Sequence, residues 1–521
     1  MTTDPGPPPS VRPMEEMRMT APIGQPRSKA AARTSLLFLG GTDTVGGVHI
    51  LVRGRAGRLL LDIGIVGNPG IVRDRTLFNA FQPPRPGSML PDYLRAGMAP
   101  LVESLYERGD LAPFVTVSDA TRALRAPGFA LDGYPLVDDE PGTDLAVFVS
   151  HLHDDHMALL EFVARNVPVI MSDAGARLHG ALVAAGALPA VHAAVTGVVP
   201  GVARSVGDLV LHVILVDHDI PGAAGVLVET PDGTMAYTGD WRRHGRHPEA
   251  MQAFADACAG VDVLITDASG AQPPDARTVQ CAQVAEREIA SLLSDLATSA
   301  HRGLYCSFDE RNLERHADVQ VVAKAHGRLL VASPRTVAIW HAAASAGLPC
   351  PRIEDIAVWD DSEGMRDDPQ PPTQPPIAPQ TAPPPTVRRV RAADVAADPA
   401  AFLCELRSSE RARLLDIGAG PGDVYAYLDG YPYGPADPGW PVLVTWMRQL
   451  GIRLETISSR GHAWEDDLRW LVDAVRPGMV IPVHTNHPDH FPGVTTPVRP
   501  VRRGDEIALS PGARTLSGDL R

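Results

Sequence analysis

The stretch that most constrains the fold is a cluster of histidines and aspartates at residues 151–156, with the sequence HLHDDH. The small and hydrophobic residues 146–150 before it predict a buried strand, and the apolar-periodic run after Met157 predicts a helix. The cluster then occupies a tight turn between a strand and a helix, which brings several polar side chains into one small volume. This turn is therefore the first candidate for a functional site.

The residue types in the turn favour metal ions. His151 and His153, two residues apart, can chelate one ion, while Asp155 and His156 diverge toward a second ion. His and Asp are also common turn residues, so an ordinary turn is the alternative. Three histidines and two aspartates within six residues favour a dinuclear metal site over that alternative.

Further along the chain, predicted strands end in residues that suit the same centre. The strand at residues 209–216 is followed by His218, whose position at a strand end suits a third imidazole ligand of the metal site. The strand at residues 234–238 is followed by Asp240, whose two carboxylate oxygens can bridge two cations. A further apolar strand ends in Asp267. Each strand end is a weak signal by itself, but their order after HLHDDH makes them a strong one.

The last part of the chain returns to the site. A predicted strand at residues 453–457 leads to His462, which precedes a helix with an acidic first turn. The strand at residues 479–483 ends at His484, where the second ion still needs an imidazole. A helix N-terminus together with an imidazolium favours an anion, so His462 is placed to hold a phosphate oxygen or to protonate a leaving group. The alternative is that His462 only caps its helix.

The remaining segments predict the organisation around this site. Short strands at residues 35–40, 49–53 and 59–62 open the first sheet, and residues 91–109 have helical spacing that suits a lid. After residue 263 a second alternating series of strands and helices begins, starting with a helix at 277–296, and we interpret it as an insertion. The closing residues 498–509 predict a hairpin.

Two stretches of the insertion stand out by composition. A run of Pro, Gln, Thr and Ala at residues 369–385 cannot pack and predicts an exposed loop. The segment LLDIGAGPG, residues 414–422, is similar to the glycine-rich first motif of adenosylmethionine-dependent methyltransferases. That cofactor site needs a helix directly after the glycines, whereas a short aromatic strand and a Pro-rich turn follow here. We interpret the glycines as a loop between strands of the insertion.

Composition limits the classes of function. The chain has 521 residues, of which 44% are hydrophobic and 21% charged, as in an ordinary globular protein of more than one domain. A formal charge of −15 supplies no general basic surface for nucleic acid, although a local basic patch is compatible with it. The five cysteines are widely spread and form no CxxC pair, which predicts neither disulfides nor a thiolate zinc site and fits the cytoplasm. Residues 1–33 lack an apolar core and predict a disordered tail, and no run predicts a membrane span.

The ordered series of site residues resembles the β-CASP branch of the metallo-β-lactamase fold. Phrases such as YTGDWRRHGRHPE, SFDERNLER and GHAWEDDLRW are similar to ribonuclease J-like bacterial hydrolases. The resemblance implies an α/β fold, a metallo-β-lactamase αββα sandwich with an inserted β-CASP-like α/β domain. It divides the chain into the tail at 1–33, a first segment of the sandwich at 34–270, the insertion at 271–455 with a Pro-rich loop at 365–387, and the closing segment at 456–521.

The resemblance also assigns the site residues. It implies one metal ion held by His151, His153 and His218, a second held by Asp155, His156 and His484, and Asp240 bridging the two. Asp267 matches the first acidic motif of the family and His462 its second motif, so Asp155, Asp267 and His462 are the expected catalytic residues. Five imidazoles and two carboxylates suit two zinc ions, and manganese or iron would tolerate the same set.

These residues predict a dinuclear metal-dependent hydrolase in which a metal-bridging hydroxide attacks a phosphodiester, in the manner of a phosphodiesterase or ribonuclease. Single-stranded RNA or another phosphodiester is the expected substrate. The alternative is a small-molecule hydrolase of an ester, lactone or amide. Asp219 departs from the family, which often has Ser directly after the third histidine, and it adds negative charge near the expected phosphate position. Arg460 is a second departure, inserted where the family has Ser-Gly-His-Ala.

Overall fold

The computed structural model describes residues 33–66, 84–122, 134–273, 284–360, 387–407, 410–429, 439–457 and 459–510. The chain divides into two units, Met1–Ala32 and Arg33–Arg521, and all that follows concerns the second. The predicted tail at 1–33 and the Pro-rich loop at 365–387 lie outside the described residues, apart from the last residue of each. No helix of the described residues is long and apolar enough to cross a membrane.

The first sheet combines the opening strands with the last strand of the described residues. Its order is β20-β1-β2-β3-β4-β5-β6. Two strands have the bounds that the sequence predicts, and the third begins two residues earlier than expected. The strands are β1 (Ser35–Gly40), β2 (His49–Arg53), β3 (Gly57–Leu61), β4 (Asp144–Phe148), β5 (Val169–Ser172), β6 (Val195–Val198) and β20 (Glu506–Ala508).

The second sheet contains the strands that lead to the later site residues. Its order is β19-β11-β10-β9-β8-β7, with β19, β11 and β10 parallel and the others antiparallel. The strands are β7 (Ala203–Val206), β8 (Leu209–Leu215), β9 (Ala224–Thr230), β10 (Gly233–Tyr237), β11 (Val263–Asp267) and β19 (Met479–Val483).

These two sheets pack face to face around one hydrophobic cluster. Alternate residues of each strand point to opposite faces, so Phe38 and Phe148 from the first sheet meet Val226 and Ile265 from the second in the same cluster. The structure therefore confirms the α/β class and the sandwich. At the common end of β10 and β11, the register places Tyr237 opposite Ile265.

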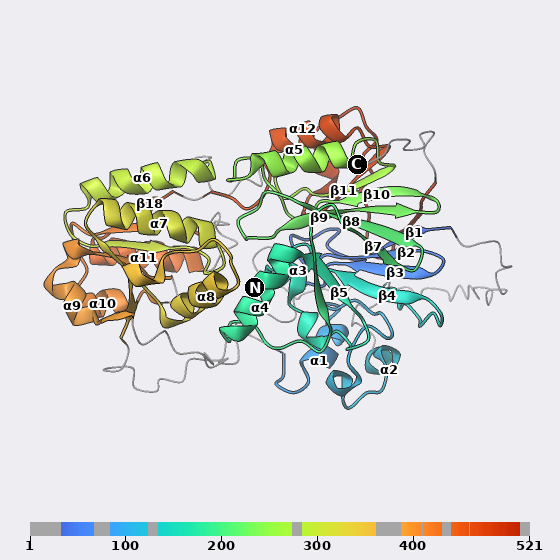
Figure 1. The fold of residues 1–521 in the computed structure, drawn as a ribbon, viewed down its shortest axis with the longest axis horizontal. Coiled ribbons are helices and arrows are strands. Elements are labelled where there is room, and N and C mark those ends of the chain that lie inside the picture. The colour runs from blue at the N-terminus through green and yellow to red at the C-terminus, as the bar shows by residue number, and fades with distance from the viewer. Residues whose placement is uncertain are drawn as a thin grey trace, which may run out of the picture. The chain divides into compact units, whose positions relative to one another are not determined.

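Helices cover the outer faces of the sandwich. α1 (Met89–Arg95) and α4 (Asp173–Ala184) pack on the first sheet, and α2 (Val117–Arg122) packs on α1. α5 (Pro248–Ala257) and α12 (Glu465–Val475) lie side by side on the second sheet (Figure 1). Their apolar faces bury Phe254 and Leu471 in the cluster that also holds Leu264 of β11.

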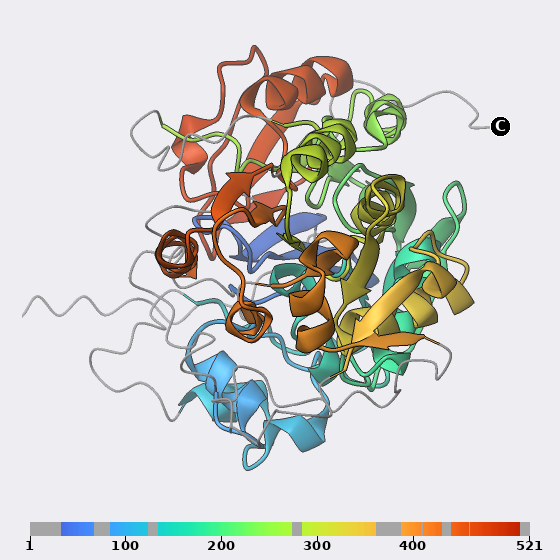
Figure 2. The same cartoon turned by 90° about the vertical axis from the view of Figure 1, so that its left-hand side faces the viewer.

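A third sheet is formed by residues 304–456 and is parallel throughout. Its order is β15-β14-β13-β16-β12-β17-β18, and Figure 2 shows β13, β14 and β15 side by side in yellow to orange. The strands are β12 (Leu304–Ser307), β13 (Leu329–Ala332), β14 (Ile356–Trp359), β15 (Arg388–Val390), β16 (Phe402–Glu405), β17 (Val424–Tyr427) and β18 (Arg453–Thr456). The predicted domain boundaries at 270 and 455 stay predictions.

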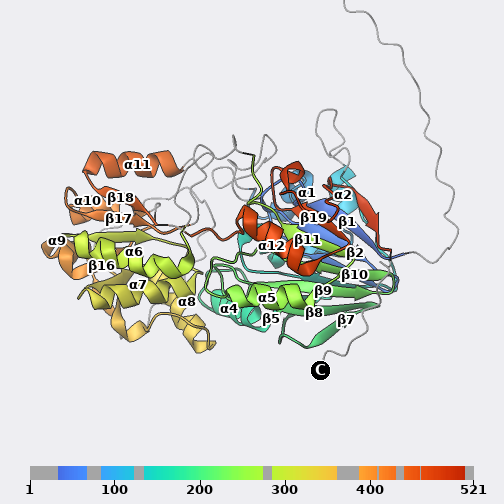
Figure 3. The ribbon, with the colours of Figure 1, turned by 90° about the horizontal axis from the view of Figure 1, so that it is seen from above.

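Helices lie on both faces of the third sheet. One face holds α6 (Glu286–Ser299), α7 (Leu313–Ala325) and α8 (Pro334–Ser345), and the other holds α9 (Ala392–Ala397), α10 (Arg413–Ile417) and α11 (Gly439–Leu450) (Figure 3). Leu304 and Tyr305 of β12 point to opposite faces and join different clusters, as expected for a sheet covered on both sides. Short 3₁₀ helices are η1 (Arg108–Leu111), η2 (Leu160–Phe162), η4 (Ile353–Asp355), η5 (Pro399–Ala401) and η8 (Pro488–His490).

Several local predictions were wrong in extent or type. The run after Met157 forms no regular helix, because α3 (Asp154–Met157) ends there and only η2 follows. The helix expected at residues 91–109 ends at Arg95, and its side chains are buried in the core instead of forming a lid. The helix expected at 277–296 begins only at Glu286, with residues 277–283 outside the described part.

The closing residues form no hairpin in the described part of the chain. β20 pairs antiparallel with β1, and Val498 bridges to Val480 of β19. The segment thereby ties the two sheets of the sandwich to each other.

In the segment at residues 414–422 the glycines form a loop, as interpreted, whereas the residues before them belong to α10. α10 ends at Ile417 and is capped by Gly418, whose φ of 68° is the left-handed conformation that favours glycine, and β17 follows without an intervening helix.

Glu405, a buried carboxyl group at the end of β16, should make stability depend on pH. Burial raises the pKa of Glu405 from 4.5 to about 8, helped by Glu410 and opposed by Arg407. Between these two values the folded chain keeps a proton that the unfolded chain has released, so the free energy of unfolding falls as pH rises. The slope from this group is up to about 1.4 kcal/mol per pH unit.

Glu405→Gln should remove this slope, because glutamine can still accept the hydrogen bond that Thr336 donates at 2.8 Å. Denaturant titrations at several pH values between 5 and 8 measure the effect. The variant should gain stability relative to the unmodified chain as pH rises, whereas a constant difference would contradict the prediction.

Candidate metal centre

All the residues predicted for metal binding or catalysis come together at the carboxyl ends of the sandwich strands. β4 leads to His151 and His153, and α3 carries Asp155 and His156. The other site residues end β11, follow β8, β10 and β19, or precede α12. They form three groups that could hold metal ions: His151, His153 and His218; Asp155, His156, Asp240 and His484; and Asp240, Asp267, His462 and His484.

The first group consists of three imidazoles whose nitrogens point at one another. His153 Nδ1 lies 3.0 Å from His151 Nε2 and 3.1 Å from His218 Nε2. Burial lowers the pKa of His151 well below its ordinary value and that of His218 to about 4, so both rings are neutral. Three imidazole nitrogens at these distances point into one space, where a cation would be stabilised.

Neighbouring groups fix which nitrogen of each ring faces this space. His218 Nδ1 lies 2.6 Å from the carbonyl oxygen of Gly461, and His151 Nδ1 lies 3.0 Å from Ser150 Oγ. When Nδ1 carries the proton toward such an oxygen, Nε2 is left as the electron-pair donor. Both rings thus present Nε2 to the centre.

The second group mixes imidazoles and carboxylates. His484 Nε2 lies 3.1 Å from Asp155 Oδ2 and 3.6 Å from Asp240 Oδ2. Burial alone would lower the pKa of His484, but the carboxylates of Asp240 and Asp155 raise it to about 10. The carboxylates therefore favour a positive charge here, supplied by a proton or by a metal ion.

Asp240 lies between the imidazoles of the first group and those of the second group. Its Oδ1 is 3.3 Å from His156 Nε2, in the second group, and its Oδ2 is 3.8 Å from His151 Nε2, in the first. Its side chain is 2% exposed, and Asp240 Oδ1 has no hydrogen-bond partner among the described residues. A carboxylate in this position can face two cations at once.

Asp240→Ala should therefore lose at least one equivalent of metal per chain. Elemental analysis after dialysis measures the content, and Asp256→Ala, which removes an exposed carboxylate from α5, is the matched control. Two ions per chain in the Asp240→Ala protein would exclude a bridging role.

Asp62 is a site residue that the sequence reasoning did not identify. It directly follows β3, is fully buried, and accepts hydrogen bonds from the backbone N–H and hydroxyl of Ser150 at 2.7 and 2.8 Å and from the hydroxyl of Tyr237 at 2.6 Å. Its Oδ2 also lies 2.7 Å from His156 Nδ1, which leaves His156 Nε2 facing Asp240. Its position at the end of a buried strand was visible in the sequence, but its partners were not.

The third group places His462 next to Asp267. His462 Nδ1 lies 3.0 Å from Asp267 Oδ2, and His484 Nδ1 lies 3.5 Å from Asp267 Oδ1. Burial alone would lower the pKa of His462, but the carboxylates of Asp267 and Asp240 raise it above its ordinary value. The N-cap of α12 is Trp464, whose backbone N–H donates to Asp467 Oδ2 at 3.3 Å, so His462 is not the residue that caps this helix.

Other histidines have structural partners. His244 stacks on Trp464 with ring centres 4.1 Å apart, and His316 Nδ1 lies 2.8 Å from the carbonyl oxygen of Asn312. His247 Nε2 lies 2.8 Å from Glu314 Oε1. None of them belongs to the groups that could hold a metal within the described residues.

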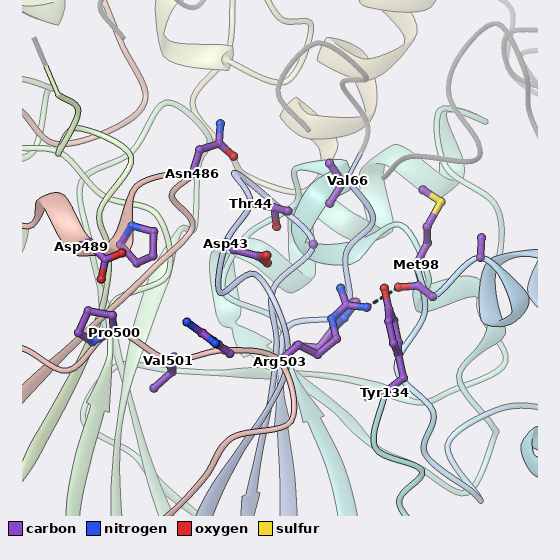
Figure 4. Close-up of a pocket in the computed structure, with 16 residues that line it drawn as sticks. Asp43, Thr44, Val66, Met98, Tyr134, Asn486, Asp489, Pro500, Val501 and Arg503 are labelled. Carbon is purple, nitrogen blue, oxygen red and sulfur yellow. Dashed lines mark hydrogen bonds between the residues drawn. The ribbon is translucent and has the colours of Figure 1, made fainter. Parts of the chain in front are cut away.

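A cavity of about 800 Å³ adjoins the loop between β1 and β2. The Gly47 N–H of this loop donates to the Asp155 carbonyl at 3.0 Å, so the cavity wall contacts the second metal-binding group. Figure 4 shows Asp43 and Asn486 on one side and Arg503 beside Tyr134 on the other. The Arg503 guanidinium lies 4.2 Å from the Tyr134 ring centre and donates to the Gly97 carbonyl at 2.7 Å.

Comparison with known proteins gives a distant relative and a similar fold. No family model matches the chain. A protein of Mycolicibacterium smegmatis named Ribonuclease J is 23% identical over 378 residues, which cover 66% of this chain and 62% of that protein. The crystal structure of a protein of unknown function from Enterococcus faecalis V583 matches with a TM-score of 0.67 and 20% identity, over 92% of this chain and all of that one.

Proposed function

We propose that the chain is a dinuclear metal-dependent hydrolase of the β-CASP, ribonuclease J-like branch of the metallo-β-lactamase fold, and that it cleaves phosphodiester bonds. The observation that carries the proposal is the position of Asp240 between the two groups of buried imidazoles. The distant relative named Ribonuclease J supports the choice of a nuclease-like reaction.

The residues present fit metal ions. His156 Nε2 and Asp240 Oδ1 are buried without hydrogen-bond partners among the described residues, as expected of atoms that face a cation. His151, His153 and His218 would hold one ion, Asp155, His156 and His484 the other, and Asp240 both. This donor set suits zinc, while manganese and iron are compatible. When bound, two such ions would acidify a water as the nucleophile and neutralise charge on a phosphodiester.

His462 is the proposed proton donor to the leaving oxygen. Asp267 holds its Nδ1, so Nε2 is the nitrogen that remains for the substrate, and the carboxylates of Asp267 and Asp240 raise the pKa of His462, which favours the protonated ring. Asp267 is 1% exposed and accepts a hydrogen bond from the Ser269 N–H at 2.8 Å. We therefore assign Asp267 a positioning role and reserve contact with the substrate for His462 and the half-buried Asp155.

The cavity beside the β1–β2 loop is a proposed site for a further part of the substrate. Its volume lies in the range of small-ligand pockets. Asn486 and Arg503 offer polar contacts there, and Tyr134 offers an aromatic ring.

A second candidate function is hydrolysis of an uncharged ester, lactone or amide. It is favoured by Asp219, a carboxylate 3.2 Å from His218 Nε2, because a negative charge at this position disfavours an anionic diester. The net charge of −15 points in the same direction.

Metal-loaded protein should be incubated with labelled single-stranded RNA, bis-p-nitrophenyl phosphate and a set of lactones, with chelated protein as the control. We expect cleavage of RNA and the diester, lost on chelation and restored by metal. Turnover of lactones without any diester cleavage would replace the proposal with the second candidate function.

A further inference from the structure

Asp219 is a carboxylate that lies beside His153 and His218 of the first group without being a member of any of the three groups. Its Oδ1 lies 3.2 Å from His218 Nε2 and 3.7 Å from His153 Nε2. It belongs to none of the groups of described residues that could hold an ion. Asp219 Oδ1 also has no hydrogen-bond partner among the described residues, and 14% of the side chain is exposed.

The carboxylate lies on the same side of the centre as the proposed proton donor. A Cβ placed on Gly461 would come within 3.3 Å of both Asp219 oxygens and within 2.8 Å of His218 Cε1. The loop that carries His462 is therefore packed directly against Asp219. The rings of His218 and His462 are 5.9 Å apart, centre to centre.

The nearest buried cations are engaged with other groups. Arg242 donates to Glu286 at 3.0 Å and to the carbonyl oxygen of Arg460 at 3.0 Å. Arg315 donates to Glu286 Oε1 at 2.8 Å. They stabilise a negative charge in this region without hydrogen-bonding to Asp219, so its acceptor capacity remains for a molecule that enters the centre.

We propose that Asp219 is a specificity-determining residue: it accepts a hydrogen bond from a hydroxyl or ammonium group that the substrate carries beside its scissile bond, and it disfavours negative charge at that position. The inference rests on the proposed function. A carboxylate can only accept, so it selects a donor.

The test uses two variants with separate effects. Asp219→Asn removes the charge and keeps an acceptor oxygen, while Asp219→Ala removes both. Asp173→Asn, which removes a charge from the exposed start of α4, is the matched control. Metal content is measured in each protein, and it should be equal in all four.

The first readout is binding of inorganic phosphate to the metal-loaded proteins by calorimetry. Both Asp219 variants should bind phosphate more tightly than the unmodified chain, by roughly 10–100-fold, because a like charge within a few ångströms has been removed. Asp173→Asn should not change the affinity. Equal affinity in all proteins, or loss of metal in Asp219→Asn, would overturn the proposal.

The second readout identifies the donor. Matched RNA and DNA oligonucleotides differ in the 2′-hydroxyl, and matched aminoacyl and acyl esters differ in an ammonium group. The unmodified chain should prefer one donor-bearing member by about tenfold or more, and Asp219→Ala should lose that preference. No preference in the unmodified chain would overturn the donor assignment. If no diester is cleaved but phosphate affinity still rises, the proposed diester reaction fails while the charge effect of Asp219 stands.

Discussion

His462→Ala is expected to keep its metal ions and to lose hydrolysis by a factor of about 10²–10⁴, the range for removal of a general acid or base. The reason is geometric. His462 has one nitrogen 3.0 Å from Asp267. The second metal-binding group is complete without His462, since it consists of Asp155, His156, Asp240 and His484. Elemental analysis and turnover of a diester, measured on the same preparation, check both parts.

His484→Ala is the matched comparison. The ring of His484 lies 5.2 Å from that of His462, but its Nε2 faces Asp155 and Asp240. This variant should lose both metal and hydrolysis. Full diester turnover by metal-replete His462→Ala protein would remove His462 from the mechanism, and metal loss in that variant would make it a ligand.

Asp62→Ala is expected to lower the free energy of unfolding of the metal-free protein by about 3–5 kcal/mol. The substitution leaves the Tyr237 hydroxyl, the Ser150 N–H and the His156 ring without their acceptor in a fully buried position. Each buried donor left unsatisfied costs about 1–3 kcal/mol. Denaturant titration of chelated protein measures the change.

Two further variants separate stability from metal binding. Ser150→Ala removes one hydroxyl, which donates to Asp62 and faces His151 Nδ1, and it should cost less than Asp62→Ala, about 1–2 kcal/mol. Asp62→Asn keeps the side-chain volume but replaces the carboxylate that contacts His156 Nδ1 with a neutral amide. Metal affinity should therefore fall by about 10–100-fold. An Asp62→Ala protein as stable as Ser150→Ala would show that Asp62 does not hold this network together.

The sequence by itself determined the ligand-bearing strand ends. Residues 151–156 follow a short apolar strand, and another such strand precedes each of His218, Asp240 and His484. Asp267 is the last residue of a further apolar strand. Apolar runs of strand length and the polar residues that end them are local properties, so they can be identified without knowledge of the partner strands. The alternating strands and helices likewise determined the α/β class.

Element extent was less predictable where tertiary packing overrides local preference. The apolar run after Met157 has helical spacing, but Leu159, Leu160 and Phe162 are all buried around a single turn of 3₁₀ helix. The closing residues look like a hairpin locally, yet pairing of β20 with β1, about 470 residues away in sequence, satisfies their backbone groups instead. Such pairings depend on which strand edges the rest of the fold leaves available.

Only the tertiary structure decided which side chains support the ligands. Asp62 contacts His156, which is 94 residues away in sequence. Asp219, in the segment after β8, packs against Gly461 in the loop before α12. Asp62 and His484 also have positive φ values, of 58° and 56°. The sequence alone does not identify these two positions as left-handed. Spacing along a chain determines which residues share a strand end, whereas contact between strand ends requires the register and packing of both sheets.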